Sequence, residues 1–189
     1  MASQSSFLEM GDEFALQTLP ARGEESHSVV GFVSGRGDIC VDFVSGDIAG
    51  AANPPRPHDC RFVVHPTSDY SASKELRKAI GMAGYSENKL AALRTQATLE
   101  RERNAANRRM REGSRIAFGD VRQLYCPSSD GYVKAEKRRA REEQFAHAVS
   151  TTADSDASRS KMSWFRVIPG FAARTEGELV RFGDVICAL

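Results

Sequence analysis

Three residues in the first half of the chain are of the types that bind metal ions. His58, Cys60 and His65 lie close together in sequence, and imidazole and thiolate are ligands that zinc prefers. A structural zinc site needs four such ligands, and no second pair at zinc-site spacing follows. We therefore favour a buried cysteine with surface histidines, and we expect neither a metal nor another cofactor.

Three aspartates, Asp12, Asp120 and Asp184, could be considered as acid/base carboxylates. Each ends a segment that reads hydrophobic, any residue, Met or Phe, Gly, Asp, at residues 8–12, 116–120 and 180–184. A Gly-Asp pair suits a tight bend, because glycine tolerates positive φ and aspartate bonds nearby backbone. The sequence also lacks a Gly-rich phosphate loop and a nucleophile elbow. It favours turn-forming aspartates, and we expect no catalytic residues and no enzyme activity.

Two basic segments could contact nucleic acid. Residues 137–141 read KRRAR between acidic neighbours, and residues 87–112 carry seven basic and four acidic side chains. The net charge of the whole chain is only +1, so no strong field favours nucleic acid overall. We interpret the segments as a solvated turn and a solvated helical face with an interaction bias, and expect no nucleic-acid partner. A nucleic-acid-binding protein remains a third hypothesis, which predicts steeply salt-dependent binding.

A second repeated element accompanies the Gly-Asp segments. Residues 62–66 and 165–169 both read Phe-x-Val-x-Pro, and each follows its own Gly-Asp pair. The interval from Gly11 to Gly119 is longer than that from Gly119 to Gly183, and the extra length matches the one region with helical character. Threefold repetition of short strands predicts a closed β structure, since closure removes exposed edges.

The helical region is predicted to be a two-helix hairpin. Leu76, Ala79, Ile80 and Ala83 form one apolar face, with Ser71 or Ser73 as the cap and Gly84 as the end. A second helix is expected from Ser86 to about Arg111, with Gly113 as its stop. We divide the chain into repeat 1 (1–67), the inserted hairpin (68–113), repeat 2 (114–179) and the start of repeat 3 (180–189).

The remaining segments read as short strands and loops. Residues 28–34 and 38–44 are predicted to pair through Gly35-Arg36-Gly37. Arg36-Gly37-Asp38 spells an integrin-binding tripeptide, but a hairpin turn is favoured because no secretory signal is present. The third repeat stops about one strand after Gly183-Asp184. We infer a fragment of a longer polypeptide, or a protein whose third unit is supplied differently.

Composition agrees with a globular protein in a reducing compartment. The 189 residues are 41% apolar and 27% charged, which is near ordinary globular usage. The four cysteines form no C-x-x-C pair, so we expect thiols in a cytosolic environment. No apolar run is long enough to span a membrane.

Several short motifs, in order, resemble the amino-terminal suppressor domain of inositol trisphosphate receptors, which is related to the ryanodine receptor amino-terminal domain. The resemblance covers about residues 5–189. The matching stretches are Ser5-Ser6-Phe7-Leu8 with Gly11-Asp12, Gly46-Asp47 with Asn53-Pro54-Pro55, Asp59-Cys60-Arg61-Phe62, Tyr70-Ser71-Ala72, and Ser163-Trp164-Phe165 with Pro169.

The resemblance implies a fold that is mainly β with an α insertion. A β-trefoil head, with its third repeat incomplete in this chain, would carry a helix-turn-helix arm. It also implies a regulatory domain that lowers ligand affinity and couples ligand binding to the gating of a calcium-release channel. The implied partners are the inositol trisphosphate-binding core of the same polypeptide and neighbouring subunits of a homotetramer, with calmodulin-like regulators as further candidates. The implied location is the cytosolic face of an intracellular calcium-store membrane such as the endoplasmic reticulum, without direct membrane contact by this domain.

Three positions match family residues implied in interdomain and intersubunit contact: Val33, Arg36 and Phe171. The family often has tyrosine at the position of Phe171, so this chain keeps the ring but loses the hydroxyl. This chain also has Ser34 where the family has an acidic residue, and this chain lacks a basic residue that is expected near Pro127. Because Val33 and Phe171 are apolar, burial within the domain itself is the competing interpretation.

A second hypothesis is a free-standing β-trefoil module that binds carbohydrate or protein ligands. The incomplete third repeat argues against it, because a lone lectin needs a closed fold.

Overall fold

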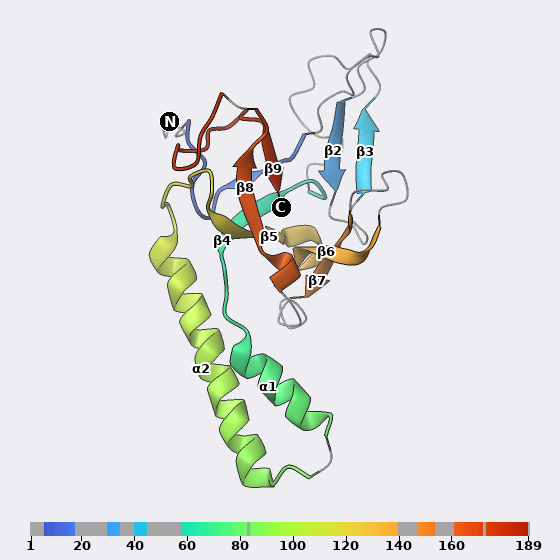
Figure 1. Cartoon of the computed structure of the whole chain (residues 1–189), viewed down its shortest axis with the longest axis vertical. Helices are drawn as coiled ribbons and strands as arrows, with labels where there is room; N and C mark the ends of the chain where they lie inside the picture. Colours follow the sequence, from blue (N-terminus) through green and yellow to red (C-terminus); the bar gives the residue numbers. More distant parts are fainter. Residues whose placement is uncertain are drawn as a thin grey trace.

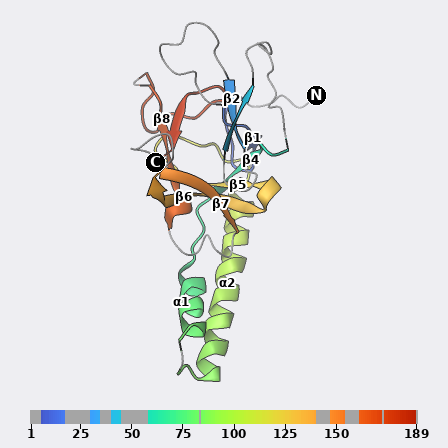
Figure 2. The same ribbon diagram turned by 90° about the vertical axis from the view of Figure 1, so that its right-hand side faces the viewer.

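The protein consists of a β head and a two-helix arm that projects from it (Figures 1 and 2). The computed structural model describes residues 6–17, 30–34, 40–44, 58–82, 84–139, 147–153, 161–171 and 173–188. We call the segment that contains the two helices, residues 68–113, the arm, and the rest of the described chain the head. The prediction of a mainly β fold with an α insertion is confirmed.

Within the described residues the strands are short and the helices are confined to the arm and two single turns. The strands are β1 (Glu13–Phe14), β2 (Val30–Ser34), β3 (Cys40–Val44), β4 (Phe62–Pro66), β5 (Val121–Cys126), β6 (Gly131–Arg139), β7 (His147–Ala153), β8 (Phe165–Pro169) and β9 (Ile186–Ala188). The arm helices are α1 (Ser71–Ile80) and α2 (Glu87–Arg111), and the short 3₁₀ helices are η2 (Pro127–Ser129) and η3 (Lys161–Ser163).

All pairings between these strands are antiparallel. The main sheet runs β1-β4-β5-β6-β7, while β8 pairs with both β5 and β9. Strands β2 and β3 form a separate hairpin at the end of the head away from the arm (Figure 1), with Ser34 opposite Cys40. The predicted pairing is therefore confirmed for these strands. The turn Gly35-Arg36-Gly37 and the Arg36-Gly37-Asp38 tripeptide lie outside the described residues.

The three Gly-Asp segments are equivalent in the structure. Gly11, Gly119 and Gly183 all adopt positive φ, at 90°, 96° and 88°, a conformation that costs side-chain-bearing residues energy. In each turn the aspartate carboxylate accepts a hydrogen bond from the backbone N–H three residues earlier, at 2.8, 2.9 and 2.8 Å for Asp12, Asp120 and Asp184. The interpretation of these aspartates as turn formers is confirmed.

A closed ring of backbone hydrogen bonds joins the same three segments. The Leu8 N–H donates to the Val180 carbonyl (2.9 Å), Val180 donates to Ile116 (2.8 Å), and Ile116 donates back to Leu8 (3.1 Å). A second set joins the same three segments in the opposite direction, with each donor two residues further along: Met10 donates to Ser114, Phe118 to Glu178 and Phe182 to Ser6, at 2.8, 2.9 and 3.1 Å. The segments therefore hold one another around a pseudo-threefold centre.

The two Phe-x-Val-x-Pro segments are also equivalent, as strands β4 and β8. Phe62 pairs with Phe14 and Phe165 pairs with Arg122, so each strand meets the residues just after its own Gly-Asp turn in the same register. The Val64 and Val167 carbonyls accept from Gly11 and Gly119, at 3.0 and 2.7 Å. The internal repeat predicted from the sequence is thus present in the backbone of the first two units.

Apolar side chains from the repeats fill the head in two adjoining clusters. The first lies at the pseudo-threefold centre and consists of Leu8, Met10, Val64, Ile116, Phe118 and Val180. The second consists of Phe62, Cys126, Val133 and Phe165. Phe14 and Leu124 pack against both. Burial of these side chains is the main favourable term that holds the short strands together.

The arm helices are held by apolar side chains between them and by polar contacts at their base. Ala79 and Ala97 are buried, and Leu90 and Leu93 are half-buried. Helix α2 ends as predicted, at Arg111, and Gly113 follows with a φ of 75°. Helix α1 ends at Ile80 and not at Gly84, and the Ile80 side chain is exposed. Thus Ile80 does not belong to the buried face that its periodicity predicted.

Candidate functional site

Val33 lies in β2 and contributes to the packing of the head. Its half-buried side chain packs against the cluster of Phe62, Cys126, Val133 and Phe165. Its N–H donates to the Leu16 carbonyl (2.9 Å), which ties the β2–β3 hairpin to the chain after β1. Val33 therefore helps to hold the hairpin in position, and the rest of its side chain is exposed to solvent.

Phe171 lies two residues after the end of β8 and is 55% exposed. The loop beyond it is fastened to the third Gly-Asp turn, because Arg174 pairs with Glu178 (3.3 Å) and with Asp184 (3.0 Å). Hydrogen bonds from Thr175 and from Arg174 hold the pKa of Glu178 below its usual value. Gly170 leaves no room for a side chain, since an added Cβ would lie 2.5 Å from Val185 Cγ1. The ring of Phe171 is thus presented to solvent on a supported loop.

The third expected contact residue, Arg36, lies outside the described residues. Val33 and Phe171 come from different elements and differ in exposure, so the structure does not bring them into one catalytic or ligand-binding cluster.

A buried amide at the base of the arm connects it to the head. Gln123 in β5 is fully buried, and its side-chain oxygen accepts from the Ser68 N–H (2.9 Å). Its side-chain nitrogen donates to the Ser163 hydroxyl (3.0 Å) and to the Tyr70 hydroxyl (3.3 Å). One side chain thereby joins the sheet, the start of the arm and the residue before Trp164.

A buried carboxylate holds the beginning of α1. Glu100 of α2 is 3% exposed and accepts from the Ala72 and Ser73 N–H groups at 2.6 and 3.0 Å. The hydroxyls of Ser71 and Ser73 also donate to it, at 3.2 and 2.6 Å. Neither serine caps the helix itself, because the N-cap position is Tyr70. The negative charge lies at the positive end of the helix dipole, where it is stabilising.

Three rings cluster where the sheet meets the arm. His65 stacks on Tyr125 with ring centroids 5.2 Å apart, and its Nδ1 hydrogen-bonds with the Tyr132 hydroxyl (2.9 Å). Burial, and secondly the charge of Arg108, lower the pKa of His65 from 6.5 to about 4. His65 is half-buried against these two tyrosines, whereas the sequence interpretation placed it at the surface. Cys60 is fully buried, as expected.

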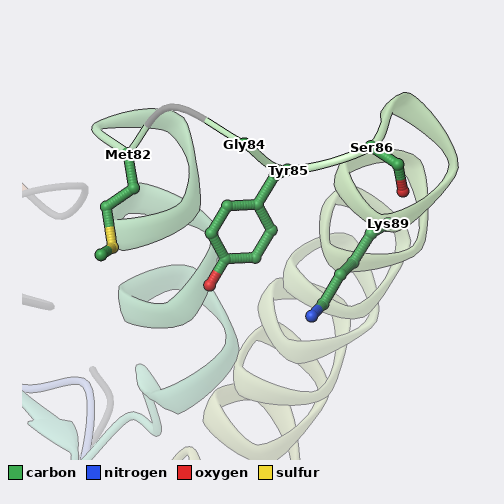
Figure 3. Close-up of a pocket in the computed structure, with 5 residues that line it drawn as sticks. All are labelled: Met82, Gly84, Tyr85, Ser86 and Lys89. Atoms are coloured by element: carbon green, nitrogen blue, oxygen red, sulfur yellow. The ribbon is translucent and has the colours of Figure 1, made fainter.

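The far end of the arm contains a pocket of about 280 Å³. It is lined by Met82, Gly84, Tyr85, Ser86 and Lys89. Met82 and Tyr85 lie in the turn between the helices, and Figure 3 shows their side chains and Lys89 on the same side of that turn. The Lys89 ammonium lies 5.0 Å from the centre of the Tyr85 ring. These residues were not singled out from the sequence, although two large apolar residues in a glycine-flanked turn are a usable signal.

No helix in the described parts of the chain has the length and hydropathy needed to cross a membrane.

Comparison with known proteins identifies the family. Residues 3–188 match the family model described as inositol 1,4,5-trisphosphate/ryanodine receptor. The chain is 28% identical over 188 residues to the inositol 1,4,5-trisphosphate receptor itr-1 of Caenorhabditis elegans. This match covers 95% of the chain but only 6% of that receptor. The chain belongs to the inositol 1,4,5-trisphosphate/ryanodine receptor family, as its motifs indicated.

Proposed function

We propose that this chain is the amino-terminal suppressor domain of an inositol trisphosphate-gated calcium-release channel. In this role it lowers ligand affinity and couples ligand binding to gating through contacts with the ligand-binding core of the same polypeptide and with neighbouring subunits. The match of residues 3–188 to the receptor family carries the proposal. The domain would act at the cytosolic face of a calcium-store membrane such as the endoplasmic reticulum.

We further propose that the head is a β-trefoil. The ring of hydrogen bonds around Leu8, Ile116 and Val180 and the matched registers of β4 and β8 support this assignment. The corresponding units are residues 1–67, 114–179 and 180–189, with the arm at 68–113. A trefoil head of this kind presents its loops and hairpins as contact surfaces around a rigid core.

The proposed mechanism is a difference in contact energy between the unliganded and liganded arrangements of the channel. Phe171 is a suitable contact residue because an exposed phenylalanine on a supported loop loses little conformational entropy on burial. Val33 and Arg36 are assigned to the same role. A coupling free energy of about 1–3 kcal/mol would change ligand affinity about 5- to 150-fold.

The test is a ligand titration on a longer polypeptide that includes the inositol trisphosphate-binding core. Phe171→Ala should raise inositol trisphosphate affinity by about fivefold, the lower end of the coupling range. Leu99→Ala is the matched control, because Leu99 is 50% exposed and lies on the arm. Circular dichroism should show that both variants are folded. Unchanged affinity in the folded Phe171 variant would contradict the role assigned to this residue.

A further inference from the structure

The tip of the arm has more exposed apolar surface than its polar sequence suggests. Among the described residues, Ile80 and Met82 are each 62% exposed and Tyr85 is 36% exposed, all within one short stretch. Such a concentration of large apolar side chains on a projecting element is typical of an interaction site. The pocket of Met82, Tyr85 and Lys89 lies within this stretch.

The arm is also strongly basic. Residues 71–112 carry ten Lys and Arg side chains and five Glu side chains, although the whole chain has a net charge of only +1. One of these glutamates, Glu100, is buried at the base of α1 and does not offset charge at the surface. Lys89 brings one of the positive charges directly into the lining of the pocket. A partner that enters this pocket must therefore be complementary to a cation beside apolar surface.

We propose that the arm tip binds a short acidic, apolar peptide segment of a partner protein. An aliphatic or aromatic side chain of the partner would lie between Met82 and Tyr85, and a neighbouring carboxylate would pair with Lys89. This site does not depend on the contacts proposed for Val33, Arg36 and Phe171.

The lining of the pocket favours a peptide over an anionic membrane. The pocket contains Ser86, and the exposed Glu87 begins α2 directly beside it. Inserting the tip into a bilayer would bury these polar groups without partners, which is costly. Figure 3 shows the side chains of Met82, Tyr85 and Lys89 on the same side of the turn between the helices. A partner that contacted the arm only through phosphate groups would leave the apolar side chains of the pocket exposed.

The test is selection of a phage-displayed library of random peptides on the full 189-residue chain, with counter-selection on Lys89→Glu. We expect enrichment of sequences that place Asp or Glu next to Leu, Met or Phe. A synthetic peptide of the enriched sequence should bind the wild-type chain, and Lys89→Gln should weaken it about tenfold, because a charge-assisted contact is lost. Tyr85→Ser should weaken binding by a similar factor.

Phe182→Ser is the matched control, because Phe182 is 51% exposed but lies on the head. Its affinity for the peptide should equal that of the wild-type chain. The proposal is overturned if no sequence is enriched, if enriched peptides lack carboxylates, or if their binding is unaffected at Lys89 and Tyr85. It is also overturned if the tip variants instead lose binding to vesicles of phosphatidylcholine and phosphatidylserine in a three-to-one ratio.

Discussion

Replacing Glu100 by glutamine tests how the arm is anchored. The change keeps the shape of the side chain but removes its charge and one of its two acceptor oxygens. Glu100 accepts four hydrogen bonds from the first turn of α1, two of them from the backbone N–H groups of Ala72 and Ser73. In the variant the new amide NH₂ faces donors, so at least one partly buried N–H is left without an acceptor.

The expected loss follows from these contacts. A buried donor without an acceptor costs about 1–3 kcal/mol, and loss of a favourable charge at a helix amino terminus adds about 0.3–1 kcal/mol. We therefore expect Glu100→Gln to lower the free energy of unfolding by about 2–3 kcal/mol. With a urea m-value of about 2 kcal/mol/M, the unfolding midpoint should fall by about 1 M.

The assay is urea denaturation followed by far-ultraviolet circular dichroism, combined with hydrogen exchange at the Ala72 and Ser73 amides. Glu102→Gln is the matched control, because Glu102 lies two residues after Glu100 in the same helix and its side chain is exposed. It should change stability by less than about 0.5 kcal/mol. If Glu100→Gln and Glu102→Gln have the same midpoint, and exchange at the two amides is unchanged, the anchoring role of Glu100 is refuted.

Two further changes test the junction between the arm and the head. Gln123→Leu should lower the free energy of unfolding, measured by urea denaturation, by about 2–4 kcal/mol. The reason is that the Ser68 N–H and the Ser163 hydroxyl lose their buried partner. A change below about 0.5 kcal/mol would contradict this expectation. Because the pKa of His65 is lowered to about 4, the unfolded chain binds a proton that the folded chain does not. Stability should therefore fall as pH drops from 6.5 towards 4, by about 2 kcal/mol once the partial exposure of the ring is taken into account. His65→Phe, compared with the wild-type chain by urea denaturation at several pH values, should remove this part of the dependence, and identical pH profiles would show that the assignment is wrong.

The repeated turns could be predicted because their signal is local. A glycine at positive φ followed by an aspartate that bonds its own turn needs no distant partner, so residues 8–12, 116–120 and 180–184 were identifiable from the sequence alone. The end of α2 was predicted for the same reason, since Gly113 stops the helix wherever it packs.

The anchors of the arm could not be predicted because their partners are distant in sequence. Glu100 reads as one more charged residue in a polar helix, and only its contact with Ser71, Ala72 and Ser73 gives it a role. Gln123 is similar, since Ser68 and Ser163 reach it from separate segments. Ile80 fits the apolar period but lies at the end of α1, beyond the surface that α2 covers.

The contact residues were predicted by resemblance and not by pattern. An isolated valine in a strand, or a phenylalanine shortly after a proline, has no periodic signature. Only the exposure of the side chain in the structure distinguishes a residue that packs in the core from one that is open to contact with a partner. The structure gives Phe171 a mostly exposed ring and Val33 a half-buried side chain against the Phe62 cluster. This difference is why the Phe171 variant is the more direct test of the proposed function.

The backbone ring around Leu8, Ile116 and Val180 has a consequence for how the polypeptide forms during translation. The N–H of Leu8 bonds to Val180, and the carbonyl of Ser6 accepts from Phe182. The first of these segments to leave the ribosome must therefore wait until the last has emerged before all of its native partners exist. The two arm helices, whose contacts with each other fall within residues 71–111, can pair before the ring closes. Synthesis should thus expose a finished helical hairpin beside unclosed β segments, a stage at which chaperones are most useful.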